Sequence, residues 1–394
     1  MHKHNCILSI NGGSSGIKFS LFKIIDPLEL LLSGEIEKIG STQAKLHYSN
    51  EVTQKTGVVN IPDADHNQAA EHLISWLETQ DSFGSVTAIG HRVVHGMKHT
   101  EPELITNNLV IELKSISAFD PEHLPGEIKL IELFRKRFPA IEQVACFDTS
   151  FHTSMPRVAK LLSIPRRYFE MGIQRYGFHG LSYAYLLEEL AHIAGKETVS
   201  QKIILAHLGN GASLAAVKDG KSVDTSMGFT PASGLPMGTR SGDLDPGAAW
   251  YLMYNEKLNL EQFNNMINYE SGLLGISGTS SDMRELINKE YTNTTAREAI
   301  EFFCYQTKKW IGSFAAVLNG VENLVFSGGI GEHVPEIRSR ICDSLAFLGI
   351  ELDEIKNMNN ETIISTDGSK VKVYVIKTNE ALMIAKLVRT ILKL

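Results

Sequence analysis

The sequence predicts an α/β fold with two domains, and three features of the chain support this prediction. The chain has 394 residues, which is more than one ordinary hydrophobic core accommodates. Strand-like apolar runs alternate with helix-like segments in the first half, as they do in an α/β layer. A unit of strand, glycine- and serine-bearing turn and strand occurs at residues 7–22 and again at residues 203–217. This indicates an internal repeat, although two unrelated hairpins would give the same pattern.

In the first half, apolar clusters and glycine-rich punctuation define the expected elements. The turn between the first two strands is Gly12-Gly13-Ser14-Ser15-Gly16. Strands are expected at Ile7–Ile10, Lys18–Phe22, Val86–Val94 and Val144–Phe147, and helices at His66–Glu78 and Pro125–Arg137.

The second half repeats the strand and turn pattern and ends in a helix. An amphipathic helix from about Asn379 to Leu392 closes the chain, and Thr378 or Asn379 is suited to cap it. Its spacing predicts that Ala381, Ala385, Val388 and Leu392 share one face. The other expected elements are strands at Ile203–Ala206, Leu214–Val217, Leu324–Phe326 and Val371–Ile376, a long helix at Ala296–Leu318 and a helix after Pro335.

The composition is that of a globular protein and argues against several functional classes. Apolar residues make up 43% of the chain and charged residues 21%. The formal net charge of -7 argues against a general nucleic-acid-binding protein, which usually has a basic surface. No apolar run approaches the ~20 residues of a membrane span, and the first residues lack the features of a signal peptide. We therefore expect neither a nucleic-acid partner nor a membrane partner.

The four cysteines and 14 histidines show no pattern typical of a metal site. The cysteines are far apart in the sequence and form no C-x-x-C motif, which argues against disulfides and zinc. They are Cys6, Cys146, Cys304 and Cys342. This usage predicts free thiols and a cytoplasmic location.

Three turns rich in glycine follow predicted strands, at residues 11–18, 207–211 and 327–332. Glycine lets backbone N–H groups approach anions closely, so turns of this kind suit phosphate groups. The first turn is not a P-loop, because Gly12 and Gly16 are separated by three residues and no Gly-Lys pair follows. One such turn is a weak signal, but three together predict a nucleotide-binding protein.

The segment from Met227 to Pro246 is too rich in glycine and proline to form a regular element. It carries Arg240, Asp243 and Asp245 among apolar residues. A surface loop with an ion pair is the simpler interpretation. Because long ordered loops are usually functional, we favour a site loop that brings Arg240 to an anion.

Several other charged or polar side chains stand at or near predicted strand ends. Arg92 lies in an apolar stretch and needs an anionic partner, for which a structural aspartate is the simplest choice. Asp148 ends the run Val144–Phe147, a position that often faces a cleft. For His179 and His207, each taken alone, a hydrogen-bonded structural role is at least as good an explanation as catalysis.

Taken together, the order and spacing of these motifs resemble the acetate kinase family over essentially the whole chain. The strings that carry the resemblance are Ile10-Asn-Gly-Gly-Ser-Ser15, Gly90-His-Arg-Val-Val-His-Gly96, Phe147-Asp-Thr-Ser-Phe-His152, Arg175-Tyr-Gly-Phe-His-Gly180, His207-Leu-Gly-Asn-Gly-Ala-Ser213, Asp224-Thr-Ser-Met-Gly-Phe-Thr-Pro231, Met237-Gly-Thr-Arg-Ser-Gly-Asp-Leu-Asp-Pro246, Gly328-Gly-Ile-Gly-Glu332 and Thr378-Asn-Glu380.

The resemblance implies two ribonuclease-H-like domains of the acetate and sugar kinase/actin superfamily, with nucleotide in the cleft between them. Residues 1–150 with 380–394 would form the first domain, on the magnesium, phosphate and carboxylate side. Residues 151–379 would form the nucleotide-binding domain. The resemblance also implies a homodimer that uses ATP or ADP, a short-chain carboxylate and Mg²⁺, for which Mn²⁺ can substitute.

The resemblance further implies a role for individual residues. Asn11 and Glu380 match the metal positions. Arg92, Val94, Phe178 and Pro231 match the positions that bind the carboxylate and its methyl group. Asp148, His179, Arg240 and Arg92 match the catalytic positions. The positions that match ATP contacts are Ser14, Lys18, His207, Leu208, Gly209, Asn210, Gly211, Asp282, Met283, Arg284, Gly329, Ile330, Gly331, Glu332 and His333.

The implied reaction is reversible in-line transfer of the γ-phosphoryl group of ATP to acetate, which gives acetyl phosphate and ADP. Arg92 and Arg240 suit this chemistry because two anions must be brought together. Acetate is already ionised at neutral pH, so we expect Asp148 to orient a cation. Propionate or butyrate kinase activity is the nearest alternative, since Glu122 stands at a position that the resemblance associates with the acyl pocket. An ATPase switch of the actin or chaperone type is a more distant one.

Overall fold

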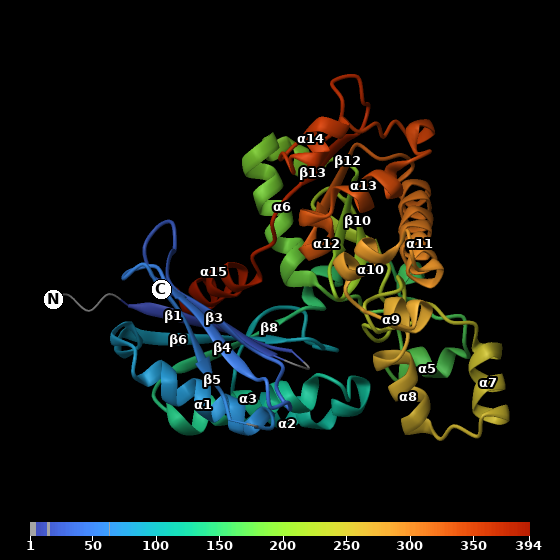
Figure 1. Ribbon diagram of the computed structural model, residues 1–394. Helices are drawn as coiled ribbons and strands as arrows, with labels where there is room; N and C mark the ends of the chain where they lie inside the picture. The colour runs from blue at the N-terminus through green and yellow to red at the C-terminus, as the bar shows by residue number, and fades with distance from the viewer. Residues whose placement is uncertain (1–4, 14–15, 63) are drawn as a thin grey trace. The chain divides into compact units, whose positions relative to one another are not determined.

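The computed structural model describes residues 5–13, 16–62 and 64–394, and the chain folds into two compact units (Figure 1). Unit 1 comprises Met1–Ser150 together with Asn379–Leu394, and unit 2 comprises Phe151–Thr378. The last helix, α15 (Glu380–Leu392), therefore belongs to the unit formed by the beginning of the chain.

Unit 1 is built on an eight-stranded mixed sheet with the strand order β5-β4-β3-β2-β1-β6-β8-β7. β1 pairs with β2 in the antiparallel direction and with β6 in the parallel direction, and β6 pairs in parallel with β8. The strands are β1 (Cys6–Gly12), β2 (Gly16–Lys23), β3 (Glu29–Glu37), β4 (Lys45–Asn50), β5 (Lys55–Asn60), β6 (Val86–Val93), β7 (Glu103–Leu104) and β8 (Glu142–Phe147).

Helices cover both faces of this sheet (Figure 1). α15 packs on one face along β1 and β6, and α1 and α3 lie on the other. A Cβ atom at Gly90 of β6 would lie 2.4 Å from Ile384 and 2.6 Å from Val388 of α15, so this glycine permits the close packing of α15. The helices of the first 150 residues are α1 (His66–Glu78), α2 (Asn107–Ser115) and α3 (Leu124–Arg137), with 3-10 turns η1 (Asp81–Ser85), η2 (Ser117–Phe119) and η3 (Ser150–His152), the last of which runs into unit 2.

Unit 2 is built on a five-stranded sheet with the order β11-β10-β9-β12-β13. β9 pairs antiparallel with β10 and parallel with β12, and β12 pairs in parallel with β13. The strands are β9 (Ile203–Leu208), β10 (Ala212–Lys218), β11 (Lys221–Thr225), β12 (Asn323–Ser327) and β13 (Lys372–Val375).

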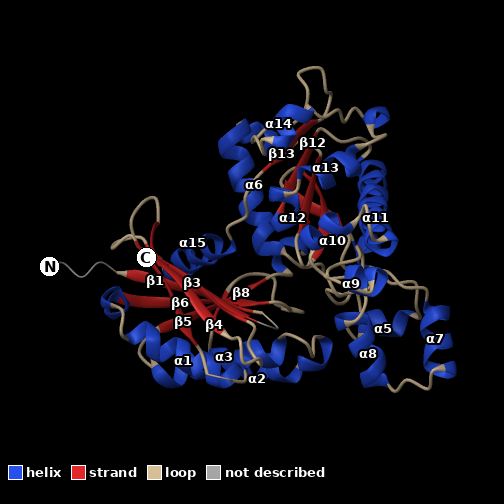
Figure 2. Cartoon of the chain, viewed as in Figure 1, coloured by secondary structure: helices blue, strands red, loops and turns tan. Residues whose placement is uncertain are grey.

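Figure 2 shows this sheet between helices. The side chains of α6 form a core with Ile203 and Leu205 of β9 and with Ala215 and Val217 of β10, and α11 packs on the other face. The helices of unit 2 are α4 (Arg157–Lys160), α5 (Arg166–Glu170), α6 (Gly180–Ala194), α7 (Pro246–Asn255), α8 (Leu260–Tyr269), α9 (Gly272–Ser277), α10 (Met283–Lys289), α11 (Thr294–Leu318), α12 (Gly328–His333), α13 (Pro335–Cys342) and α14 (Glu354–Met358), with 3-10 turns η4 (Lys196–Ser200) and η5 (Ala346–Leu348).

The two sheets share one topology over five strands. The order β3-β2-β1-β6-β8 in unit 1 corresponds to β11-β10-β9-β12-β13 in unit 2, with the same parallel and antiparallel pairings. The two strand–turn–strand units of the sequence are thus β1–β2 and β9–β10, in equivalent places of two related sheets. This supports the internal repeat over the alternative of two unrelated hairpins.

One detail of the expected elements is wrong. The segment after β12 is not only a turn, because α12 begins at Gly328 and is followed directly by α13. The buried residues of α15 are Met383, Ile384, Ala385 and Val388. They include Ala385 and Val388 of the expected apolar face, whereas Ala381 and Leu392 are partly buried.

Every helix within residues 5–13, 16–62 and 64–394 is too short or too polar to span a membrane. Cys6, Cys146, Cys304 and Cys342 are buried free thiols.

Candidate active site

Arg92 and Asp148 form a buried ion pair in unit 1. Arg92 lies near the end of β6 and Asp148 directly follows β8, its parallel neighbour. Nε and Nη2 of Arg92 donate to Oδ2 of Asp148 at 3.0 and 2.5 Å, and Nη1 donates to Oδ1 of Asn11 at 3.1 Å. The Asp148 side chain is fully buried, whereas 15% of the Arg92 side chain is exposed. The fold thus brings together three residues that the sequence indicated separately.

The neighbours of Arg92 maintain its positive charge. Burial lowers its pKa, but the charges of Asp148 and Glu380 and the hydrogen bonds to Asp148 outweigh burial and raise the pKa above its usual value. A guanidinium group has five N–H donors. The bonds to the described residues use one N–H each of Nε, Nη1 and Nη2. Two N–H groups are left, which is the number that a carboxylate or phosphate needs for a two-point contact.

Asn11 and Glu380 lie side by side at the end of β1 and the start of α15. Nδ2 of Asn11 donates to Oε2 of Glu380 at 2.8 Å. The described residues contain no group of three or more His, Cys, Asp or Glu side chains that could hold a metal ion by themselves. An amide and one carboxylate fit a magnesium ion that takes its other ligands from water and phosphate, as Mg²⁺ commonly does.

Glu127 of α3 is a buried carboxyl group near this ion pair. Its Oε2 accepts the backbone N–H of Val94 at 3.0 Å, and its Oε1 has no hydrogen-bond partner among the described residues. Burial raises the pKa of Glu127 well above its usual value, although Arg92 and the N–H of Val94 act in the opposite direction. The group therefore stays protonated to a higher pH than an exposed glutamate does.

We expect Glu127→Gln to stabilise the protein at pH 8 but not near pH 4.5. A carboxyl with a raised pKa in the folded state favours folding below its unfolded pKa, and this advantage is lost as pH rises through the folded value. Glutamine keeps an acceptor for Val94 and cannot ionise. Urea unfolding of both proteins from pH 4.5 to 8 measures the difference. If the variant were less stable at pH 8, Glu127 would be a useful anion beside Arg92 and the inference would be wrong.

Lys18 and Ser14 were predicted to contact phosphate in the first glycine turn. Lys18 lies directly opposite Asn11 in the β1–β2 pair. Its side chain is 64% exposed, and its Nζ lies 3.7 Å from Oε2 of Glu35. An exposed ion pair of this length contributes little, so the lysine is able to turn toward another anion. Ser14 lies outside the described residues.

The two glycine-rich segments of unit 2, residues 209–211 and the start of α12, lie against each other. They follow β9 and β12, which are parallel neighbours. A Cβ atom at Gly328, where φ is 76°, would lie 2.6 Å from the carbonyl oxygen of Leu208. A Cβ at Gly209 would lie 3.8 Å from the backbone nitrogen of Gly329. Glycine at position 328 therefore permits a backbone contact that unites two of the predicted nucleotide-binding segments.

His179 and Arg240 converge on Gly211 in this part of unit 2. A Cβ at Gly211 would lie 3.3 Å from Nε2 of His179 and 3.8 Å from Nη1 of Arg240. The ring of His179 also packs on the ring of His207, with 4.5 Å between their centroids. A guanidinium and an imidazole nitrogen beside a glycine turn are suited to bind the oxygens of a phosphoryl group.

The predicted site loop has no regular secondary structure over residues 227–245, its last residue Pro246 begins α7, and it is tied to the same turn. The N–H of Gly238 donates to the carbonyl oxygen of Asn210 at 2.9 Å. Nη1 of Arg240 donates to the carbonyl oxygen of Pro231 at 3.2 Å and to the sulfur of Met237 at 3.7 Å. The loop thus holds Arg240 in place by contacts with its own chain.

The three residues predicted for the methyl pocket are all buried. Phe178 is held by its carbonyl oxygen, which accepts a hydrogen bond from Nε2 of His152 at 3.0 Å, while Nδ1 of His152 pairs with Ser222. Burial lowers the pKa of His152 to about 4, so its ring is neutral near pH 7. Val94 belongs to unit 1, whereas Phe178 and Pro231 belong to unit 2. Their common pocket stays a prediction.

The helix α12 is held from both ends by charged side chains. Oε1 of Glu332 accepts the N–H of Gly328 at 2.9 Å, so this carboxylate is directed into its own helix. The fully buried Arg338 donates to the carbonyl oxygen of Gly331 at 2.8 Å. The side chain of His333 is 62% exposed. The helix contains five of the predicted nucleotide contacts, namely Gly329, Ile330, Gly331, Glu332 and His333.

The remaining predicted nucleotide contacts lie at the start of α10. Asp282 caps this helix by accepting the N–H of Arg284 at 2.8 Å, and Nη2 of Arg284 donates to Oδ2 of Asp282 at 2.7 Å. Arg284 is exposed, whereas the side chain of Met283 is buried in the core. Arg284 and the backbone of this turn are therefore more accessible to a ligand than the Met283 side chain.

Several polar residues that support the site were not predicted from the sequence. Glu127, His152, Tyr183 and Ser213 each contact a residue predicted for the site or its backbone. Glu127 had a detectable signal, because it stands on the apolar side of α3 with Leu124 and is buried there. The other three depend on strand register and helix placement, which the sequence pattern does not reveal.

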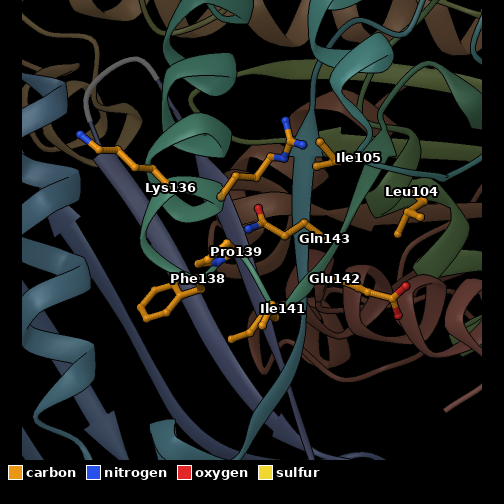
Figure 3. A pocket seen from close by; sticks show the side chains of 10 residues that line it. Leu104, Ile105, Lys136, Phe138, Pro139, Ile141, Glu142 and Gln143 are labelled. Atoms are coloured by element: carbon orange, nitrogen blue, oxygen red, sulfur yellow. The ribbon is translucent and has the colours of Figure 1, made fainter.

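Unit 1 also contains a separate pocket of about 390 Å³ (Figure 3). It lies where β8 begins, at the opposite end of this strand from Asp148. None of the residues predicted for the site is among the described residues that line it, which are Leu104, Ile105, Arg135, Lys136, Phe138, Pro139, Ala140, Ile141, Glu142 and Gln143. It is therefore not part of the site described above.

Comparison with known proteins identifies the family. Residues 6–386 match the model of the Acetokinase family. The chain belongs to the acetokinase family. The acetate kinase of Halothermothrix orenii is a similar member, with 42% identity over 391 residues that cover 96% of this chain and 98% of the relative. The family predicted from the sequence motifs is confirmed.

Two solved kinase structures have the same fold as this chain. A propionate kinase from Francisella tularensis matches with a TM-score of 0.92 and 38% identity, covering 98% of this chain and 99% of that structure. The acetate kinase of Porphyromonas gingivalis matches with a TM-score of 0.88 and 36% identity, covering 98% of this chain and all of that structure (100%). The predicted fold class, an α/β protein of this kinase type, is confirmed.

Proposed function

We propose that this member of the acetokinase family transfers the γ-phosphoryl group of ATP reversibly to acetate, which gives acetyl phosphate and ADP. The observation that carries the proposal for the acceptor is the environment of Arg92. Asp148 and Asn11 fix its guanidinium group and leave two N–H donors for an incoming carboxylate. A kinase that phosphorylates a carboxylate needs this kind of fixed cation, because its substrate and the phosphate are both anions.

Acetate is the nucleophile, and no general base is required. One acetate oxygen forms a bond to the γ-phosphorus as the bond from that phosphorus to the ADP oxygen breaks, so ADP leaves with the bonding electrons and no proton is transferred. We assign the carboxylate to Arg92 and the methyl group to Val94, Phe178 and Pro231. Because Asp148 accepts two hydrogen bonds from Arg92, we assign it an orienting role.

The nucleotide and the moving phosphoryl group are assigned to residues of unit 2 and to Lys18. The segment His207–Gly211 and the helix α12 offer closely packed glycine backbone, and the start of α10 is assigned to the adenosine. His179 and Arg240 converge on Gly211, and we assign them to the oxygens that gain charge in the transition state.

Magnesium is the metal that we propose, with manganese as a substitute. Asn11 and Glu380 would hold it, and their oxygen atoms suit a hard cation that keeps several waters. When bound, the ion supplies positive charge to the phosphate oxygens. EDTA should abolish turnover and excess Mg²⁺ should restore it, whereas full turnover in EDTA would contradict this assignment.

We further propose a cytoplasmic homodimer. Four free thiols suit a reducing compartment. In unit 2, α7 and the start of α8 expose large apolar side chains, among them Trp250, Tyr251, Tyr254 and Leu260, and α7 has no buried residue. An exposed apolar surface of this kind is typical of a contact with another chain. Sedimentation velocity at micromolar concentration should give a species of twice the chain mass, and a monomer would contradict the proposal.

The choice of acceptor is tested by comparing carboxylates. We expect kcat/KM to be highest for acetate and about tenfold or more lower for propionate, because a methylene group changes binding in an apolar pocket by ~1–3 kcal/mol. Acyl phosphate is trapped with hydroxylamine in reactions that contain ATP, Mg²⁺ and acetate, propionate or butyrate. A higher kcat/KM for propionate would favour propionate kinase activity, the alternative suggested by the similarity to a propionate kinase structure.

A further inference from the structure

Ser213 is a buried residue that contacts His179, a residue of the candidate site in unit 2. It lies on β10 directly opposite His207 of β9. Because side chains alternate along a strand, Ser213 shares a face with Ala215 and Val217, which pack against α6. Ser213 is fully buried. Its hydroxyl group is therefore directed into the interface between the sheet and the first turn of α6.

Two residues of this turn contact the Ser213 hydroxyl. Nδ1 of His179 lies 2.8 Å from its Oγ, and the hydroxyl oxygen of the fully buried Tyr183 lies 2.5 Å from the same atom. His179 and Tyr183 are four residues apart and so lie on the same side of the helix. Ser213 thus links a buried tyrosine to one nitrogen of the histidine, while the other nitrogen lies near Gly211 and Arg240.

The hydrogen bonds that join Tyr183, Ser213 and His179 allow two arrangements of their hydrogen atoms. In one, Tyr183 donates to Ser213 and Ser213 donates to Nδ1, so a neutral His179 carries its proton on Nε2. In the other, Nδ1 donates to Ser213, and a neutral His179 presents a lone pair on Nε2. Nε2 of His179 and Nη1 of Arg240 lie 3.3 and 3.8 Å from the Cβ position of Gly211. A phosphoryl oxygen held there by Arg240 would be repelled by a lone pair and attracted by an N–H.

We propose that Tyr183 and Ser213 are positioning residues that hold His179 as its Nε2–H tautomer and aim this N–H at the phosphoryl oxygens. The inference rests on the proposed role of His179. A histidine held in this way donates a hydrogen bond while neutral, and Arg240 supplies the positive charge. In enzymes that use histidine, the hydrogen bond at one ring nitrogen commonly determines whether the other ring nitrogen is protonated.

The tautomer is measured directly by ¹⁵N NMR of histidine side chains in the full-length protein without substrate. His179→Gln identifies the signal of His179 by its loss. In the unsubstituted protein we expect protonated Nε2 and unprotonated Nδ1. Ser213→Ala should give a mixture of both forms, and Ser213→Thr, which keeps the hydroxyl group, should restore the single form. An Nδ1–H form in the unsubstituted protein, or an unchanged tautomer in Ser213→Ala, would overturn the proposal.

Kinetics of the same variants separate a loss of His179 orientation from a general disruption of the structure. We expect Ser213→Ala to lower kcat about ten- to a hundredfold, with much smaller changes in KM for ATP and acetate, and Ser213→Thr to recover most of the loss. Tyr183→Phe should change the tautomer and kcat in the same direction as Ser213→Ala but less, since Ser213 keeps its own proton. Loss of kcat in Ser213→Ala without rescue by threonine would contradict the proposal. Full turnover by His179→Gln would instead refute the catalytic role of His179, with the tautomer result unaffected.

Discussion

Arg240→Ala is expected to lower kcat about 10²–10³-fold, as removal of one preorganised donor to a transition state does in other enzymes. The contacts to Pro231 and Met237 hold the guanidinium group in advance, and Nη1 lies near the Gly211 turn. The charge is therefore in place before the phosphoryl group develops its transition-state charge. Because ground-state binding relies on other groups as well, the KM for ATP should change much less than kcat.

Steady-state kinetics with varied ATP and acetate measure this effect. Arg297→Ala is a suitable control, because Arg297 is an exposed residue of α11 whose Nε lies 3.9 Å from Glu301. This control should keep normal activity. An unchanged kcat in Arg240→Ala would remove Arg240 from the mechanism.

Arg92→Ala is expected to affect both stability and acetate binding. It leaves the fully buried Asp148 without its cation, and breaking a buried ion pair in this way typically costs ~3–5 kcal/mol. It also removes the two N–H groups assigned to the acetate carboxylate, so the KM for acetate should rise by at least tenfold in any folded fraction. Urea unfolding and acetate titrations measure the two effects.

Two further variants separate the loss of stability from the loss of acetate binding. Arg92→Lys keeps the charge but loses the planar fork, so it should recover much of the stability and leave the acetate KM high. Arg137→Ala, which breaks the exposed ion pair with Glu78, should leave the unfolding midpoint nearly unchanged. An acetate KM that stays normal in Arg92→Lys and Arg92→Ala would show that another group binds the carboxylate.

Local signals in the sequence were sufficient to predict helices with clear capping residues and strands that end at glycine. The bounds of α1 were predicted correctly because Asp65 and Gln68 form a capping box just before an apolar face. Asn379 caps α15 in the same way, by accepting the N–H of Leu382. The ends of β1, β9 and β12 were visible because glycine interrupts strongly apolar strands.

Other elements depend on contacts that form only in the folded protein. β4 and β5 carry few buried side chains, so their apolar pattern is weak and their pairing with β3 defines them. The helix α12 begins with two glycines, which are poor helix formers. Its stability derives from the carboxylate of Glu332 and the buried Arg338. A sequence pattern predicts a turn at this place.

In the candidate site, too, some features were predictable from the local sequence, whereas others depend on contacts in the folded protein. The sequence indicated that Arg92 needs an anion and that Asp148 stands at a strand end, and parallel pairing of β6 with β8 unites them. The contact of Ser213 with His179 and Tyr183 could not be predicted, because it depends on the register of β9 with β10 and on the position of α6. Residue types that carry charge are thus visible in a sequence, whereas the neutral groups that orient them are not.

Direct measurement of the products tests the central claim, that ATP phosphorylates a carboxylate on this chain. The protein is incubated with ATP and Mg²⁺, with and without acetate, and acetyl phosphate, ADP and free phosphate are followed by ³¹P NMR. We expect ADP and acetyl phosphate to form in equal amounts and only when acetate is present. Release of free phosphate at the same rate without acetate, and with no acetyl phosphate, would contradict the claim and favour an ATPase.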